Sequence, residues 1–198
     1  MTGGVPPLAR VLAAKLLTHA HIDRDPEIIA AAFTPAIVAM DAADRVYRLA
    51  IESILPPDDA REVLGTMAAF RHTVARLRNE TATEIRALYE RAGKSYGNFD
   101  PLDTFTPSTS GLAHVDGVRV ADLSDRARAE TARLRTESNA RIGPHIGTHG
   151  AQIVAEKKRR VTDFKGALHA VIVPLVGGGA HKVSPIIDDL ASIADGYY

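Results

Sequence analysis

Apolar residues recur at steps of three and four through most of this chain, which is the spacing of one face of an α-helix. The most regular stripe predicts a single helix over residues 57–92, about 50 Å long at roughly 1.5 Å per residue. Shorter stripes predict helices over 7–20, 35–55, 122–142 and 150–164. The residues of the long stripe are Val63, Met67, Phe70, Val74, Leu77, Thr81, Ile85 and Leu88.

Proline and glycine mark where several of these helices begin or end. Asp25-Pro26 has the composition of an N-cap followed by proline at the first helical position. Thr34-Pro35 repeats that pattern, so we expect either a kink or a new helix there. Gly143-Pro144 is expected to end the helix that starts near residue 122, and Gly93 is expected to cap the long helix.

Two segments break the helical pattern and predict strands. Asp116-Gly117 supplies the positive φ angles of a tight turn, so a small β-hairpin is expected over 112–120. Residues 168–176 form a run rich in branched apolar side chains, for which a strand is favoured over a helix. The glycines at 177–179 then form a turn, and Ser184-Pro185 starts a final short helix that ends near residue 194.

Together these elements predict a mainly α protein with one long helix, a helical hairpin and a small β element. An N-terminal helical region covers 1–93, a loop and β-hairpin cover 94–120, and a C-terminal helical region with a short strand covers 121–198. Only Pro56-Pro57 separates the 35–55 helix from the long helix. We therefore expect those two helices to form the antiparallel hairpin.

The composition allows a sizeable core but leaves few specialised chemistries open. Apolar residues make up 45% of the sequence, which is an ordinary share for a globular protein. The absence of cysteine excludes disulfides, thiolate metal ligands and thiol nucleophiles. No apolar run approaches the roughly 20 residues of a membrane helix. We expect a cytoplasmic protein with no membrane partner and no cofactor.

Basic residues raise the alternative of a nucleic-acid-binding regulator. Lys and Arg together number 24, as do Asp and Glu, so no global field attracts the chain to phosphates. The only dense basic cluster is Lys157, Lys158, Arg159 and Arg160, with Lys165 nearby. It could contact phosphates, but successive helical positions differ by roughly 100°, so these side chains do not share one face. A solvated helix segment is the favoured interpretation.

The histidines are weak candidates for a metal or ligand site. His145 and His149 are four residues apart, which is the spacing of one helix face. The neighbouring Gly-Pro and the lack of a His-Glu-x-x-His motif favour a structural or surface role. His169 and His181 could join them in space, which would make the chain a small-ligand binder or an enzyme.

The leading hypothesis is a structural or interaction protein, a helical subunit of a homo-oligomer or of a larger assembly such as a virion connector. The 35–55 helix is shorter than the long helix, so the distal turns near Ile85 and Leu88 are left uncovered. Long exposed apolar patches are rare on soluble monomers, so a partner chain is favoured over the second region of the same chain as their cover. The expected interface consists of Met67, Phe70, Val74, Leu77, Ile85 and Leu88.

Overall fold

The computed structural model describes residues 5–20, 22–91, 114–115, 118–177 and 180–198, and these residues are almost entirely helical. The mainly α class predicted from the sequence is therefore confirmed. The elements are α1 (Pro7–Ala20), α2 (Pro26–Ala32), α3 (Thr34–Ile54), α4 (Pro57–Arg91), β1 (His114–Val115), β2 (Val118–Arg119), α5 (Val120–Ile146), the 3-10 turn η1 (Gly147–His149), α6 (Gly150–Val176) and α7 (Ala180–Tyr197).

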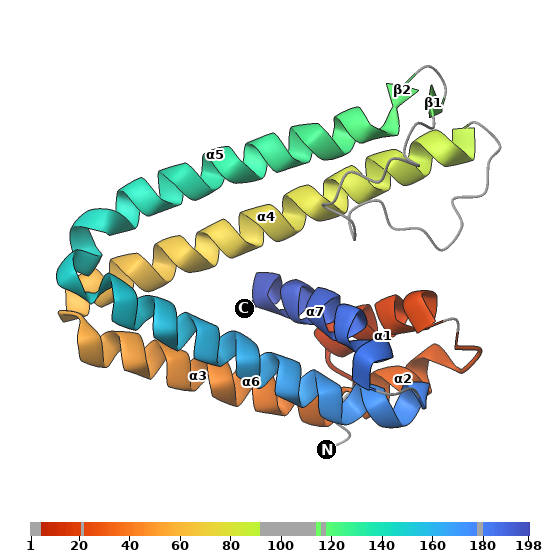
Figure 1. Ribbon diagram of the computed structural model, residues 1–198, viewed down its shortest axis with the longest axis horizontal. Coiled ribbons are helices and arrows are strands. Elements are labelled where there is room, and N and C mark those ends of the chain that lie inside the picture. The colour runs from red at the N-terminus through yellow and green to blue at the C-terminus, as the bar shows by residue number, and fades with distance from the viewer. Residues whose placement is uncertain (1–4, 21, 92–113, 116–117, 178–179) are drawn as a thin grey trace.

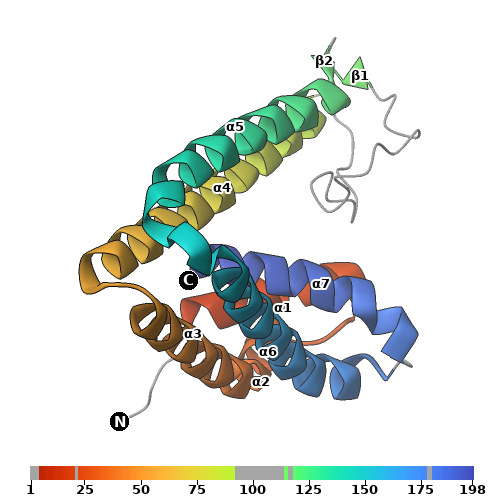
Figure 2. The same ribbon diagram turned by 60° about the vertical axis from the view of Figure 1, so that its left-hand side comes forward.

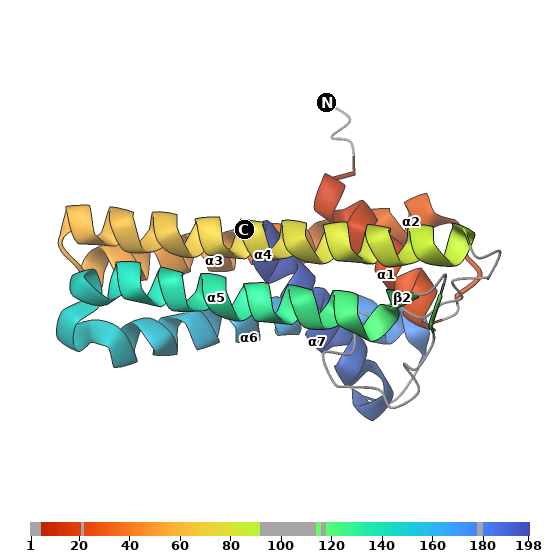
Figure 3. The same cartoon turned by 90° about the horizontal axis from the view of Figure 1, so that it is seen from above.

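Four long helices form two antiparallel pairs that meet at one end and splay apart at the other (Figure 1). One pair is α4 with α5, and the other is α3 with α6. The chain passes between the pairs from α3 to α4 and from α5 through η1 to α6, and both connections lie at the end where the pairs meet. Seen from above, α4 lies over α3 and α5 over α6 (Figure 3).

The predicted hairpin between α3 and α4 is wrong. The two helices diverge from the turn at Leu55 and Pro56, and the close partner of α4 along its length is α5 (Figure 1). An apolar stripe shows that one face of a helix must be buried, but it does not show which helix covers that face. As a result, helices of the stretch 1–93 pack mainly on helices of the stretch 121–198.

The main core lies at the open end of the α3–α6 pair, where α1, α2 and α7 pack on it (Figures 1 and 2). α7 also contacts α4. A Cβ atom added to Gly196 would lie 3.0 Å from the Cβ of Ala75, so α7 and α4 approach closely there. α7 thus joins the two helix pairs across the opening. Among the buried core residues are Leu12, Phe33, Met40, Phe164, Leu168, Ile172 and Leu190.

A second core lies where the two pairs meet, which we call the vertex. Polar contacts join α5 to α4 at the vertex. Nδ1 of His145 lies 2.7 Å from Oδ1 of Asp59, and Arg141 donates to Glu62 at 2.5 Å. The guanidinium of Arg141 lowers the pKa of the Glu62 carboxyl. The buried residues of the vertex are Tyr47, Ile51, Leu55, Ala60, Val63 and Ile153.

The strand predicted over 168–176 is wrong, because α6 runs without a break to Val176. Its buried side chains, Arg160, Phe164, Leu168 and Ile172, follow one another at steps of four. This helical stripe extends through the branched run, so the run packs as a helix despite its strand-like composition. Gly177 ends α6 in the left-handed region at φ 64°.

Most helix starts were predicted better than helix ends, but the start of the final helix at Ser184-Pro185 is wrong, because α7 begins at Ala180 and contains Pro185. The helices expected over 7–20, 35–55 and 57–92 are confirmed, and Oδ1 of Asp25 caps α2 by accepting the N–H of Glu27 at 2.9 Å. The expected stop at Gly143-Pro144 is wrong. α5 continues to Ile146, where Ile142 and Ile146 pack against the vertex core.

The region between α4 and α5 is described only in part. β1 and β2 pair antiparallel through His114 with Arg119 and Val115 with Val118. The β-hairpin expected over 112–120 is therefore reduced to two residue pairs among the described residues. The predicted turn at 116–117, the loop 94–111 and the cap at Gly93 lie outside the described residues.

Candidate functional site

The distal part of the predicted interface is buried within the single chain. Ile85 is 0% exposed and Leu88 4% exposed, on the helix that packs along α5, where Leu123 and Ala127 are buried as well. The second region of the same chain covers these turns, which is the alternative that the sequence analysis ranked lower.

The part of the stripe nearer the start of α4 is partly buried and partly lines a pocket. Val74 is buried and Leu77 is half-buried. Met67 and Phe70 are half-buried as well, and both line a pocket between the helix pairs. The stripe is therefore not one continuous surface that a partner could cover.

The basic cluster is not brought together on one surface. Arg160 is 1% exposed, so it is an interior residue. Lys158 and Arg159 are exposed, and Arg159 pairs with Glu156 at 2.9 Å. Lys165 pairs with Asp188 at 2.7 Å, and Lys157 lines the pocket between the helix pairs.

The histidines do not gather into a cluster either. His145 contacts Asp59 at the vertex, whereas His149 and His169 are exposed on η1 and α6. The side chain of His181 lies outside the described part of the structure. Among the described residues, no group of three or more His, Asp or Glu side chains could hold a metal ion.

A buried charged cluster surrounds Arg160 and ties α3, α6 and α7 together. Nε of Arg160 forms an ion pair with Oδ1 of Asp44 at 2.8 Å, and Nη1 of Arg160 donates to Oδ1 of Asp195 at 2.5 Å. The rings of Tyr47 and Phe164 lie 5.4 and 4.7 Å from the guanidinium carbon. Burial raises the pKa of the Tyr47 phenol. The cluster therefore consists of paired charges enclosed by aromatic rings.

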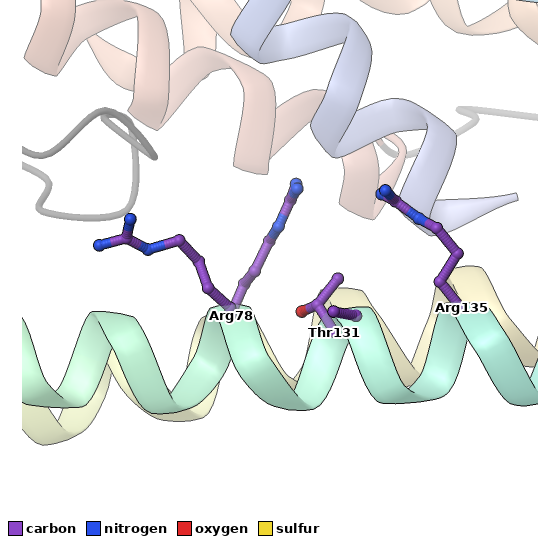
Figure 4. Close-up of a pocket in the computed structure, with 5 residues that line it drawn as sticks. Arg78, Thr131 and Arg135 are labelled. Carbon is purple, nitrogen blue, oxygen red and sulfur yellow. The ribbon is translucent and has the colours of Figure 1, made fainter.

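Two pockets that share Arg135 lie along the α4–α5 pair, and each has arginine side chains in its wall. The first has a volume of about 290 Å³ and is lined by Arg78 of α4 and by Arg128, Thr131, Ala132 and Arg135 of α5. Figure 4 shows Arg78 and Arg135 extending from the α4–α5 pair toward the side where α7 lies. Nη1 of Arg78 donates to Oγ of Ser192 on α7 at 2.9 Å.

The second pocket, which we call the vertex pocket, has a volume of about 220 Å³ and shares Arg135 with the first. α4 contributes the buried Arg71, whose Nη2 donates to the backbone oxygen of Tyr198 at 3.2 Å. Burial lowers the pKa of Arg71, and the nearby positive charge of Arg160 lowers it further. The lining is Met67, Phe70, Arg71, Arg135, Ser138, Asn139, Ile142 and Lys157.

The arginines of both pockets were not predicted, although the sequence carries a signal for them. Arg71 and Arg78 are seven residues apart on one predicted helix, and Arg128 and Arg135 are seven apart on another. Positions seven apart lie on the same helix face. Two such pairs show that two helices each carry a cationic face, although not that the faces adjoin.

An exposed apolar stripe on α3 was also missed. Its side chains point away from the buried face that α3 packs on α6, and they recur at steps of three and four. Val38 is 64% and Leu49 63% exposed. We call this surface the outer face of α3, and it consists of Pro35, Val38, Ala42, Val46 and Leu49.

Comparison with known proteins does not assign a function to these sites. No protein-family model matches the chain, and neither the curated proteins nor the solved structures gave a match. Among the described residues, no single helix is long and apolar enough to cross a membrane; α2 and α3, which are bent by 40° at the break between them, meet that length and composition only as a pair.

Proposed function

We propose that this protein is a helical interaction subunit that forms a homodimer through the outer face of α3. The observation that supports this proposal is the exposure of Val38 and Leu49 on a 21-residue helix whose opposite face is buried. Single exposed apolar residues are common, whereas an aligned series on one helix is typical of an interaction surface. The site differs from the α4 stripe expected from the sequence, because α5 covers the distal turns of that stripe while Met67 and Phe70 line a pocket.

The outer face is self-complementary when two copies of α3 run antiparallel with Ala42 on the two-fold axis. Val38 then lies opposite Val46 of the second copy, and Pro35 lies opposite Leu49. Arg45, which has no ion-pair partner among the described residues, comes close to Asp41 of the other copy. Such reciprocal pairing is the property of a two-fold interface between identical chains.

The size of the outer face limits the strength of the proposed dimer. Val38, Val46 and Leu49 of both copies contribute about 1 to 2 kcal/mol each on burial. Association costs roughly 4 kcal/mol or more in lost translational and rotational freedom. The balance is no larger than about 8 kcal/mol, which corresponds to a dissociation constant no tighter than about 1 μM.

Light scattering on wild-type protein and on two variants tests the dimer. The wild type should have the mass of a dimer at about 100 μM, well above a micromolar dissociation constant. Val38→Asp with Leu49→Asp should give a monomer with unchanged helix content, because both positions are exposed in the single chain. Val11→Asp is the matched control, since Val11 is 49% exposed on α1, outside the outer face, and the dimer should persist.

Two outcomes would contradict the proposal. One is a strictly monomeric wild type at that concentration. The other is binding of the wild type to phospholipid vesicles that the double variant loses, since this would assign the outer face to a membrane surface. The nucleic-acid and histidine-site alternatives, like the virion connector, stay predictions of the sequence, and no contact described above favours them.

A further inference from the structure

We propose that the vertex pocket is a binding site for a small phosphate monoester. The phosphate group lies among Arg71, Arg135 and Lys157, and the organic group of the ester lies against Met67, Phe70 and Ile142. Ser138 and Asn139 donate hydrogen bonds to the phosphate oxygens. This site is separate from the outer face of α3, and the proposal does not depend on dimer formation.

The lining of the vertex pocket is positively charged. The pocket walls carry three cations and no acidic residue. The other arginines of α5 have carboxylate partners; for example, Arg126 pairs with Glu84 at 2.6 Å and Arg141 with Glu62 at 2.5 Å. In contrast, neither Arg135 nor Lys157 has an ion-pair partner among the described residues. Their charges are therefore free to act on an anion in the pocket.

The guanidinium of Arg71 is both buried and incompletely hydrogen-bonded. It is 6% exposed. Its Nε and Nη1 atoms are buried and have no hydrogen-bond partner within the described parts of the chain. Leaving donors of a charged group buried and unpaired costs free energy. Arg71 lines the vertex pocket, so its positive charge adds to those of Arg135 and Lys157 there, while the carboxylates of Asp195 and Asp44 also act on it.

The mixed character of the walls selects the kind of anion. Three cations and two neutral donors suit a dianion with several acceptor oxygens better than a single carboxylate. The apolar side chains Met67, Phe70 and Ile142 offer no partner to a bare inorganic ion. The volume of about 220 Å³ corresponds to about seven water molecules at about 30 Å³ each, which is room for a phosphate group and part of an attached ring.

Isothermal titration calorimetry with phenyl phosphate and inorganic phosphate tests the site. Phenyl phosphate should bind saturably, at least about tenfold more tightly than inorganic phosphate, and more weakly as salt is added. Arg135→Ala and Lys157→Ala should each lower its affinity at least about tenfold, because each removes a charge-assisted hydrogen bond. Phe70→Ala should reduce the preference for phenyl phosphate over inorganic phosphate.

Two exposed cations next to the site provide matched controls with the same change in charge. Arg133 pairs with Glu130 on α5, and Lys158 is exposed beside Lys157; neither lines the pocket. Arg133→Ala and Lys158→Ala should change the affinity less than about twofold.

Several results would overturn the assignment. The first is that neither probe binds saturably at concentrations up to about 10 mM, since a specific site would bind more tightly than that. The second is that the control variants lose as much affinity as the pocket variants, and the third is that the two probes bind with equal affinity. Displacement of phenyl phosphate by a DNA duplex would also overturn it, in favour of a nucleic-acid surface. The mass measured by light scattering is independent of these results, so failure of this proposal and failure of the dimer are distinguishable.

Discussion

The burial of Arg160 follows from its helical spacing, not from its charge. The sequence analysis grouped it with Lys157, Lys158 and Arg159 because the four basic residues are consecutive. Its position four residues before Phe164 places it instead on the buried face of α6. Charge alone predicts exposure for all four residues. The structure separates them because consecutive residues on a helix face different neighbours.

Removing Arg160 should destabilise the protein strongly. Arg160→Ala leaves Asp44 without one of its two arginine partners and Asp195 without the donor at 2.5 Å. Breaking a buried ion pair by deleting one partner costs about 3 kcal/mol of the free energy of unfolding. Arg159→Ala, on the exposed side, should cost no more than about 0.5 kcal/mol. Equal midpoints in urea unfolding for the two variants would contradict the buried cluster.

Tyr198 should make stability depend on pH in the alkaline range. Its hydroxyl donates to Asp41 at 2.6 Å, and burial together with this carboxylate raises the pKa of the phenol. An unfolded tyrosine has a pKa of about 10. The stabilisation from Tyr198 is therefore fully present below about pH 10 and is lost as the pH rises from there toward the higher pKa of the folded state.

The comparison of Tyr198→Phe with the wild type isolates this effect. The difference in their free energies of unfolding should shrink between about pH 9.5 and 11. A difference that stays constant over this range would mean that the contact of Tyr198 with Asp41 does not form in solution.

At the scale of elements, periodicity predicted where helices lie but not which face contacts which neighbour. The stripe of α4 and the start signals at Asp25-Pro26 and Thr34-Pro35 were sufficient to place α2, α3 and α4. The run 168–176 misled because branched side chains favour strands on average. The buried positions at steps of four along α6 outweigh that average preference in this chain.

The α4–α5 pair should depend on Ile85 for its stability. Ile85 is fully buried in the single chain, so Ile85→Ala should lower the free energy of unfolding by about 3 kcal/mol without changing the mass of the particle. Ile28→Ala is the matched control at an isoleucine that is 65% exposed, with an expected effect below about 0.5 kcal/mol. A variant at Ile85 that dissociates an assembly and keeps its stability would restore the interface expected from the sequence.

At the scale of the whole molecule, the sequence did not predict which helices pack against each other. The two faces of Arg71 and Arg135 adjoin only because α4 and α5 run antiparallel, and Lys157 joins them only because α6 returns from the vertex. Apolar stripes built mainly of Ala, Leu, Ile and Val are similar to one another, so they do not specify their partners. The vertex pocket could therefore not be predicted from the sequence, although the sequence does show on which face of its helix each of the cations on α4 and α5 lies.

The separation of the two helix pairs should depend on the contact of α7 with α4. Gly196→Val places a branched side chain where even a Cβ lies 3.0 Å from Ala75, so it should lower the free energy of unfolding by about 2 kcal/mol. Small-angle scattering should show a larger radius of gyration as the pairs separate. Gly65→Val, in open space on α4, is the control and should change neither quantity appreciably. An unchanged radius for Gly196→Val would show that α7 does not hold the pairs together.

The pairing of α3 with α6 also has a consequence for synthesis on the ribosome. α3 ends at Ile54 and α6 ends at Val176, so α3 emerges about 120 residues before its partner is complete, or roughly 6 to 24 s at 5 to 20 residues per second. During that interval both the inner face, with Met40, Tyr47 and Ile51, and the outer face are open to solvent. The nascent chain therefore presents α3 as a two-sided apolar helix during that interval, which is the kind of segment that a chaperone acting on nascent chains binds.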